Sequence, residues 1–368
     1  MKFLCSNFDM MSAINASGKA AASNSSFPIL ETLLIEAGKD NSIKVTGSNN
    51  EITIEYVFEA NVYSEGSIAV DARMFSEIIR RMPEGMIDFE VMSDKNVNIK
   101  CGELDFNIMG INGDEFPKIP DVTYQQEIIT NADSLLSVIR KTSFAVAMSD
   151  INPILTGIKL EINSNNMKGI AVDGYRLAIK NTPIEVYHDL SFTVQGRALN
   201  ELSKIMVPGD EKVSISLAEK NVLFKFGSCR FFSRLLEGEF INYNNVIPKE
   251  KLYSARVEVK ELVKSIDRAS LLAESGGIIN PVKIAYDLNN ITITCDTAKG
   301  HLKEVIAVNG NGNETFEVGY NCKFMLDALK AIDDEYVMIE LNGNITPTVL
   351  RPVEGDEYLY IVLPVRIR

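Results

Sequence analysis

The chain repeats one short pattern three times, at a constant spacing of 124 residues. Each copy is a run of alternating apolar residues that leads directly into a stretch with helical spacing; the copies are residues 67–73, 191–197 and 315–321. A period this long corresponds to a whole domain rather than to one turn of a solenoid. The repeat therefore predicts three similar domains in one chain, and an array of this kind can curve until it closes into a ring.

The length of 368 residues agrees with this division, because it exceeds what one hydrophobic core usually organises. Stretches that end in proline close the first two copies, where an extended connection is favoured. We therefore expect domains at residues 1–122, 123–249 and 250–368.

The composition predicts a folded protein without a membrane span, since 46% of the residues are hydrophobic and no apolar run reaches 18 residues. The N-terminus lacks the apolar core of a signal peptide. The five cysteines stand far apart, which favours reduced thiols over disulfides or a zinc site. Together these features predict a cytoplasmic protein.

Each copy divides into two similar halves, in which a short strand, an amphipathic helix and further alternating strands follow one another. Leu135, Leu136 and Ile139 recur at helical intervals, whereas Ile52 and Ile54 recur with the period of a strand. The six helices are expected at residues 9–19, 72–81, 133–141, 197–206, 260–268 and 321–332. Alternating strands bury one face, so the predicted class is α+β, with sheets covered on one side by helices and other strands.

The charge is distributed unevenly between the helices and the rest of the chain. The formal net charge of −13 taken alone argues against a nucleic acid partner. However, the six helix windows hold 13 basic and 7 acidic side chains, whereas the remainder holds 24 basic and 43 acidic ones. If the helices share one face, that face is suited to phosphates without reading sequence. The alternative is that these residues only occupy solvated helix faces and favourable C-terminal ends.

Several stretches are distinctive as sequences: IAVDGYRLA at 170–178, FFSRLLEGEF at 231–240 and YLYIVLPVRIR at 358–368. Together with the opening Met1-Lys2-Phe3 and with FPIL at 27–30, they resemble the bacterial DNA polymerase III beta subunit family, the sliding clamps. The resemblance extends over the full length and agrees with the triple repeat.

The resemblance implies a DNA clamp fold of three similar domains, each a pair of strand–helix–strand units. It implies a head-to-tail homodimeric ring with helices inside and sheets outside, through which double-stranded DNA passes without sequence-specific contact. It implies that the subunit itself catalyses nothing, and we expect neither a cofactor nor a metal. A separate clamp loader opens the ring, and the polymerase catalytic subunit, the loader and repair proteins dock through short linear peptides. Such a protein acts in the bacterial cytoplasm, at the nucleoid.

In this arrangement the basic helix residues face DNA. The expected set is Lys19, Arg73, Arg80, Arg81, Arg140, Lys141, Arg197, Lys204, Lys264, Arg268, Lys323 and Lys330. Weak, salt-screened contacts from such a wall let the protein move along DNA, while encirclement prevents its escape.

The resemblance also implies a groove for client peptides between the second and third domains. The matching positions are Leu155, Val172, Gly174, Tyr175, Arg176, Leu177, Val246, Pro347, Ile361, Val362, Leu363, Pro364, Val365 and Arg366. An apolar trough of this kind takes leucine and phenylalanine side chains, and Arg176 and Arg366 are expected to hold polar groups of the client. A charge at Leu177 or Leu363 is then expected to abolish peptide binding and leave the dimer intact.

The groove departs from the family pattern at four positions, which leaves the client preference open. Val172 stands where threonine is common, Tyr175 where histidine is common, Ile241 where proline is common, and Asn245 where arginine is common. The alternative reading treats residues 173–176 as an ordinary turn and Ile361–Leu363 as a core strand.

For the ring contact, the resemblance implies that the first domain of one chain meets the third domain of the other. Phe106 and Ile108 match interface positions on an edge strand, and Leu271 and Leu272 match positions after a helix. An edge strand that pairs across chains would no longer be open to aggregation. The alternative is that all four are core residues.

Two other classes of function are alternatives to a clamp. An enzyme with an active site at a domain seam would need a clustered acid–base pair, and the sequence has only His188 and His301 and no phosphate-binding loop. A scaffold that binds peptides but not DNA is opposed only by the basic bias of the helices.

Overall fold

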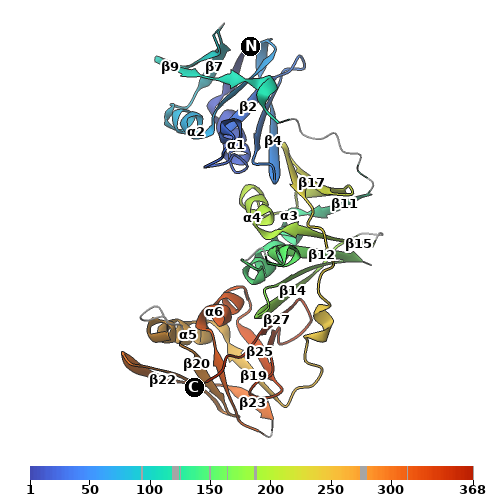
Figure 1. The fold of residues 1–368 in the computed structure, drawn as a ribbon, viewed down its shortest axis with the longest axis vertical. Coiled ribbons are helices and arrows are strands. Elements are labelled where there is room, and N and C mark those ends of the chain that lie inside the picture. The colour runs from blue at the N-terminus through green and yellow to red at the C-terminus, as the bar shows by residue number, and fades with distance from the viewer. Residues whose placement is uncertain are drawn as a thin grey trace. The chain divides into compact units, whose positions relative to one another are not determined.

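The computed structural model describes residues 1–92, 94–117, 124, 126–148, 151–163, 165–185, 189–273, 280–312 and 314–367 (Figure 1). Contacts divide the chain into two compact units. The first combines Met1–Asp133 with Arg197–Leu235, and the second combines Ser134–Gly196 with Leu236–Arg368. The segment predicted as the middle domain therefore contributes to both units.

The first unit contains a five-stranded and a nine-stranded antiparallel sheet. The order of the smaller sheet is β5-β1-β7-β8-β9, with β1 (Lys2–Ser6), β5 (Asn61–Ser64), β7 (Met86–Val91), β8 (Asn96–Cys101) and β9 (Leu104–Met109). The order of the larger sheet is β10-β6-β2-β3-β4-β18-β17-β16-β11, with β2 (Thr32–Ala37), β3 (Ser42–Ser48), β4 (Ile52–Glu59), β6 (Gly66–Asp71), β10 (Ile111–Asn112), β11 (Gln126–Asn131), β16 (Lys212–Leu217), β17 (Asn221–Phe226) and β18 (Cys229–Arg234). Because β4 pairs with β18, residues predicted for the first and second domains share one sheet.

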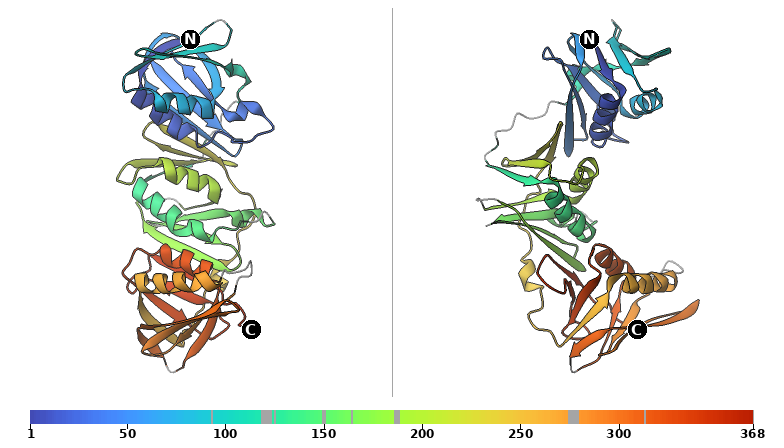
Figure 2. Two further views of the ribbon diagram at one scale, coloured as in Figure 1. Left: turned by 90° about the vertical axis from the view of Figure 1, so that its left-hand side faces the viewer. Right: turned by 180° about the vertical axis from the view of Figure 1, so that it is seen from behind.

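Three helices belong mainly to this unit: α1 (Asn7–Ser17), α2 (Ala72–Arg81) and α4 (Gly196–Ile205). Helices α1 and α2 lie side by side, and α1 packs on β3 and β4 (Figure 2). The Ser6 hydroxyl accepts a hydrogen bond from the backbone N–H of Asp9 and caps α1. Asp71 caps α2 in the same way through Met74 N–H. The core between the helices and sheets includes Phe3 stacked on Phe89, with ring centroids 4.8 Å apart.

The second unit contains a nine-stranded and a four-stranded antiparallel sheet. The order of the larger sheet is β15-β12-β13-β14-β27-β26-β25-β19-β23, with β12 (Gly157–Asn163), β13 (Asn166–Val172), β14 (Arg176–Pro183), β15 (Leu190–Gln195), β19 (Tyr253–Glu258), β23 (Asn309–Gly312), β25 (Tyr336–Leu341), β26 (Thr348–Arg351) and β27 (Tyr358–Val362). The order of the smaller sheet is β22-β21-β20-β24, with β20 (Val282–Tyr286), β21 (Asn290–Thr297), β22 (Gly300–Ala307) and β24 (Phe316–Tyr320). The β14–β27 pairing joins residues predicted for the second and third domains.

The helices of this unit are α3 (Ala132–Thr142), α5 (Val259–Ala273) and α6 (Cys322–Lys330). Helices α5 and α6 lie side by side, α5 packs on β21, and α6 touches β27 (Figure 2). Asn321 caps α6 through the backbone N–H of Lys323. These contacts place α6 next to the strand that carries much of the predicted groove.

All six predicted helices are present, and each repeat copy is a strand followed at once by a helix: β6 to α2, β15 to α4, and β24 to α6. Helix α1 begins two residues earlier than predicted, because Ser6 and Asp9 form a capping pair. Helix α5 continues to Ala273, because no glycine or proline interrupts residues 269–273. The class is α+β, with helices packed on antiparallel sheets, as predicted.

All five cysteines are buried, and none of them forms a disulfide in the described structure. Among the helices of the described ranges, none is long and apolar enough to span a membrane. The same ranges hold no group of three or more metal-ligating side chains.

Candidate functional site

The hairpin turn between β13 and β14 presents the first part of the predicted groove. Asp173 shapes this turn, since its Oδ1 accepts hydrogen bonds from the backbone N–H groups of Tyr175 and Arg176, at 3.0 and 3.1 Å. Gly174 lies at φ +88°, in the left-handed region that favours glycine. The turn leaves Tyr175 exposed and directs Arg176 and Leu177 inward. Residues 173–176 are thus a turn, and this turn orients the predicted groove residues.

Strand β27 and the segment after it present the second part. Arg176 pairs with Val362, and Leu177 with Ile361, in the β14–β27 ladder. Beyond the strand, the backbone N–H of Leu363 donates to the carbonyl oxygen of Tyr175 at 2.8 Å. The two stretches singled out in the sequence therefore lie side by side, although they are far apart along the chain.

An apolar cluster joins these strands to the connection between β18 and β19. Its buried members are Ile154, Ile170, Val172, Leu177, Ile179, Phe240, Tyr243, Val349 and Ile361, with Leu155, Leu236, Ile241, Ile247 and Leu359 packed against it. The structure thus brings together four predicted groove residues: Leu155, Val172, Leu177 and Ile361. Val246 is partly exposed and follows Tyr243 of the cluster. Pro347 lines a hollow of about 150 Å³ together with Pro248 and Arg351, and Val349 of the cluster lines the same hollow.

Exposure separates the predicted groove residues into two groups. Leu177, Ile361 and Val362 are at most 1% exposed, and Val172 and Arg176 are also buried, so these five form the floor beneath the surface. The residues that a ligand can reach are Leu155, Gly174, Tyr175, Val246, Pro347, Leu363, Pro364, Val365 and Arg366. Because the Leu177 side chain is core, a charge there would disturb the fold, so this substitution cannot test peptide binding separately from the dimer. Leu363 remains suitable for this substitution.

Arg176 differs from its predicted role. Its side chain is 7% exposed, and its Nε and Nη1 donate to Asp173 and Asp327 at 2.9 and 2.6 Å. Its guanidinium also lies over the rings of Phe324 and Phe144, 4.6 and 5.7 Å from their centroids. A guanidinium held in this way is committed to its own chain, so Arg366, which is exposed, is the better candidate for holding client polar groups.

The connection after β18 supplies residues of the apolar cluster that the sequence analysis did not include in the predicted groove. Phe240 and Tyr243 are buried in the cluster, and the Tyr243 hydroxyl donates to Glu161 at 2.8 Å. Burial and this carboxylate raise the pKa of Tyr243. Burial opposes ionisation of Glu161, but its hydrogen bonds with Lys159 and Tyr243 outweigh burial and lower its pKa. The sequence motif FFSRLLEGEF ends at Phe240, so this motif could have pointed to the connection after β18 as part of the cluster.

Eleven of the twelve predicted DNA-facing side chains belong to exposed residues. Four of the eleven pair with neighbouring helix carboxylates, and Arg268 pairs with Glu304 of β22 through two hydrogen bonds. Over the described parts of the chain, six have no ion pair and remain available for phosphates: Lys19, Arg73, Arg140, Arg197, Lys264 and Lys323. Lys19 lies in the turn after α1 rather than within the helix.

Lys141 departs from the prediction. Its side chain is largely buried and its Nζ lies 2.5 Å from Asp333 Oδ2. Both residues line a cleft of about 540 Å³, which also contains Lys180, Glu357 and Tyr358. The local sequence at the end of α3 gives no hint of this pair, because Asp333 lies far along the chain. Lys141 is therefore a poor candidate for contact with DNA.

Of the four predicted interface residues, two are exposed, one is partly buried and one is buried. Phe106 is 36% exposed on β9 and Leu271 is 77% exposed on α5. Ile108 is buried in the core of the first unit, and Leu272 is partly buried. The core alternative therefore holds for Ile108. Strands β9 and β22 are both edge strands, and they expose further apolar side chains that the prediction missed: Leu104, Met109 and Val305.

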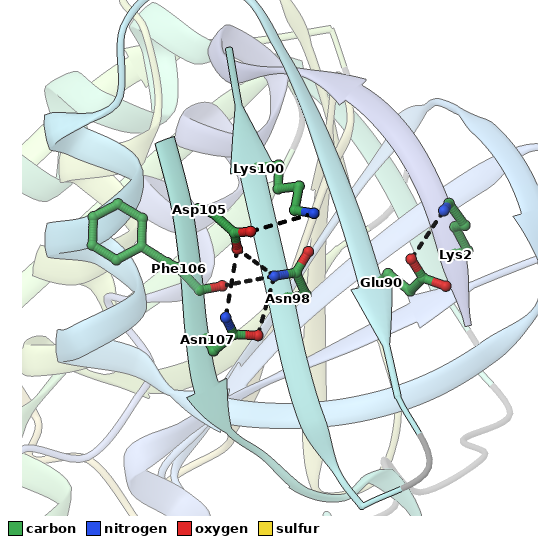
Figure 3. A network of polar contacts seen from close by, with 7 residues as sticks. All are labelled: Lys2, Glu90, Asn98, Lys100, Asp105, Phe106 and Asn107. Carbon is green, nitrogen blue, oxygen red and sulfur yellow. Dashed lines mark hydrogen bonds and ion pairs between the residues drawn. The ribbon is translucent and has the colours of Figure 1, made fainter. Parts of the chain in front are cut away.

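A polar network fixes β9 onto its neighbour β8 (Figure 3). The Asn98 side chain donates to Asp105, to Asn107 Oδ1 at 3.1 Å and to the carbonyl oxygen of Phe106 at 3.5 Å. Lys100 pairs with Asp105 at 3.3 Å. Figure 3 shows the Phe106 ring pointing away from this network. The edge strand is thus held in place on its inner side while its outer backbone edge stays open.

Comparison with known proteins gives matches along the whole chain. Residues 1–120, 130–242 and 244–366 match the N-terminal, central and C-terminal domains of the DNA polymerase III beta subunit. A protein of Bacillus subtilis named beta sliding clamp is 32% identical over the full length of both chains. A Staphylococcus aureus protein of the same name is 31% identical over all of this chain and 99% of its own.

Solved structures agree and have the three-domain DNA clamp fold of mixed helices and sheets that the sequence predicts. The DNA polymerase sliding clamp from Bacillus subtilis is 31% identical, covers all of both chains and has a TM-score of 0.95. A putative DNA polymerase III beta subunit from Eubacterium rectale is 32% identical, covers 99% of both chains and has a TM-score of 0.94. The chain therefore belongs to the DNA polymerase III beta subunit family, the beta sliding clamps.

Proposed function

We propose that this chain is one half of a ring-shaped DNA sliding clamp, a homodimer that encircles duplex DNA and does no chemistry of its own. The observation that carries the proposal is the match of three successive beta subunit domains across residues 1–366. The proposal includes three clamp domains at residues 1–122, 123–249 and 250–368. It also includes action at the nucleoid in the bacterial cytoplasm.

The charge distribution supports DNA as the ligand. Six exposed cations without an ion pair in the described ranges come from all six helical regions, in a chain whose net charge is −13. Such residues release counterions from phosphates, and the acidic remainder repels DNA elsewhere. A few screened contacts retain DNA without gripping it, which suits a protein that must slide.

The two open sheet edges support a head-to-tail dimer. Strand β9 ends a sheet of the first unit and β22 ends a sheet of the second. Each carries exposed apolar side chains, and Leu271 of α5 adds another. A contact between unlike edges closes two chains into a ring only when the angle per chain suits closure, and it then covers both edges.

The reachable apolar side chains beside β14 and β27 support a peptide groove. The proposed ligands are short linear segments of the polymerase catalytic subunit, the clamp loader and repair proteins. Burial of two client side chains would contribute roughly 3–6 kcal/mol before ordering costs, which alone corresponds to a Kd between about 6 mM and about 40 μM, so micromolar binding by a single peptide requires further contacts. Weak single sites become effective when DNA holds both partners together.

The decisive experiment compares retention on circular and linear DNA. The protein is loaded by a clamp loader with ATP onto nicked circular plasmid, and half of the sample is then cut once. A clamp stays on circular DNA and leaves the cut DNA within minutes. A protein that binds only the DNA surface is retained equally on both, and equal retention would contradict the proposal. Sedimentation equilibrium should first give twice the chain mass of 40.8 kDa, because a monomer cannot enclose DNA.

A further inference from the structure

Helix α6 contacts the rim of the proposed peptide groove through two residues on one of its faces. Phe324 and Asp327 are three positions apart, so they lie on the same side of the helix. Asp327 accepts the 2.6 Å hydrogen bond from Arg176, and the Phe324 ring lies against the Arg176 guanidinium. Phe324 also stacks on Tyr175, with centroids 5.7 Å apart and planes 27° from parallel. Helix α6 therefore contacts both Tyr175 and Arg176, which are neighbours in the turn between β13 and β14.

The burial of Arg176 makes Asp327 important for this arrangement. A guanidinium that is 7% exposed needs counter-charges, since an unpaired buried charge is strongly unfavourable. Asp173 supplies one of them, but its Oδ1 is already engaged by the backbone of its own turn. Asp327 supplies the other and is the more exposed of the two carboxylates. Among the described residues, it is the acidic partner of Arg176 that comes from outside the hairpin.

The turn transmits this fixation to the groove wall. Tyr175 accepts the backbone hydrogen bond of Leu363 at 2.8 Å, and Arg176 pairs with Val362 in the ladder. A displacement of Arg176 therefore moves the backbone that carries Tyr175 and loosens Leu363. Both of these residues are among those that a ligand can reach.

We propose that Asp327 and Phe324 are positioning residues of the client-peptide groove: α6 holds Arg176 and Tyr175 in place and thereby sets the affinity for apolar peptides. The inference rests on the groove assigned under the proposed function. It explains an acidic residue in the otherwise basic α6, because the charge of Asp327 serves Arg176.

The test measures peptide binding by full-length variants. The probe is a fluorescein-labelled synthetic hexapeptide with two leucines and one phenylalanine, and anisotropy gives Kd at 15 °C and 150 mM salt. Asp327→Asn removes one charge with little change in shape and is expected to weaken binding about tenfold. Asp327→Glu keeps the charge and should stay within threefold of the unsubstituted protein. The matched control Asp333→Asn, whose carboxylate pairs with Lys141 in the cleft, should change Kd by less than twofold.

A double-mutant cycle separates positioning from general weakening of the fold. If Asp327 acts through Arg176, Asp327→Asn causes no further loss in an Arg176→Ala background. Phe324→Leu gives a second variant, with an expected loss of about fivefold, should Asp327→Asn fold poorly by circular dichroism. An unchanged Kd for both variants, or losses that simply add to that of Arg176→Ala, would overturn the inference. Failure of the unsubstituted protein to bind the probe would reject the groove itself and the inference with it.

Discussion

The proposed ring contact can be tested by truncating Leu271, because its side chain is 77% exposed in the single chain. Leu271→Ala removes three carbon groups worth about 0.8 kcal/mol each when they are buried. Scaled by that exposed fraction, the loss is about 2 kcal/mol at each contact. A two-chain ring contains the contact twice, so the dimer should lose about 4 kcal/mol, which raises its Kd by roughly 100-fold to 1,000-fold.

The substitution isolates association from folding. Alanine has the highest helix propensity, so α5 is not weakened, and a mostly exposed side chain contributes little to the core. Sedimentation velocity over a concentration series gives the dimer Kd. Leu252→Ala is the matched control, because Leu252 is also partly exposed but lies on neither β9 nor β22. A Kd within threefold of the unsubstituted protein for Leu271→Ala would refute the reasoning.

Three further predictions concern the proposed peptide groove, one DNA-facing lysine and the Arg268–Glu304 pair. Leu177→Ala should lower the free energy of unfolding by about 2–5 kcal/mol in urea titrations, whereas Leu363→Asp should abolish peptide binding with little effect on that energy. Lys323→Gln should lower the salt dependence of DNA retention by about one phosphate contact; an unchanged slope would remove Lys323 from the DNA-facing set. The Arg268 hydrogen bonds lower the pKa of Glu304. The unsubstituted protein should therefore have a higher free energy of unfolding than Glu304→Gln at pH values above about 4.3, and this difference should disappear as the pH is lowered. A difference that increases in acid would contradict the prediction.

Local patterns in the sequence were sufficient to predict the helices and the repeat. Apolar spacing places Leu135, Leu136 and Ile139 on one buried face of α3, and α2 has its predicted bounds because Asp71 and Pro83 flank it. The start of α1 was missed although its signal is local, since Ser6 and Asp9 form a capping pair before the apolar spacing begins.

The parts that could not be predicted depend on partners remote in sequence. Arg176 reads as a ligand-binding cation, but Asp327, 151 residues away, neutralises it. Lys141 looks like one more cation of a basic helix, but it forms an ion pair with Asp333. Phe106 and Ile108 are two positions apart on β9 and therefore lie on the same face of the strand. Ile108 is nevertheless the more buried of the two, and only tertiary packing decides this. Propensity and spacing carry no information on such pairings.

The two ladders β4–β18 and β14–β27 have a mechanical consequence. Bending the chain at either junction would tear rows of interstrand hydrogen bonds and expose the apolar side chains beneath them, so neither junction can serve as an easy hinge. An interface between two separate molecules has no covalent link across it, so it can dissociate and form again. In the proposed ring, the contact between two molecules would therefore open more readily than either of these two junctions.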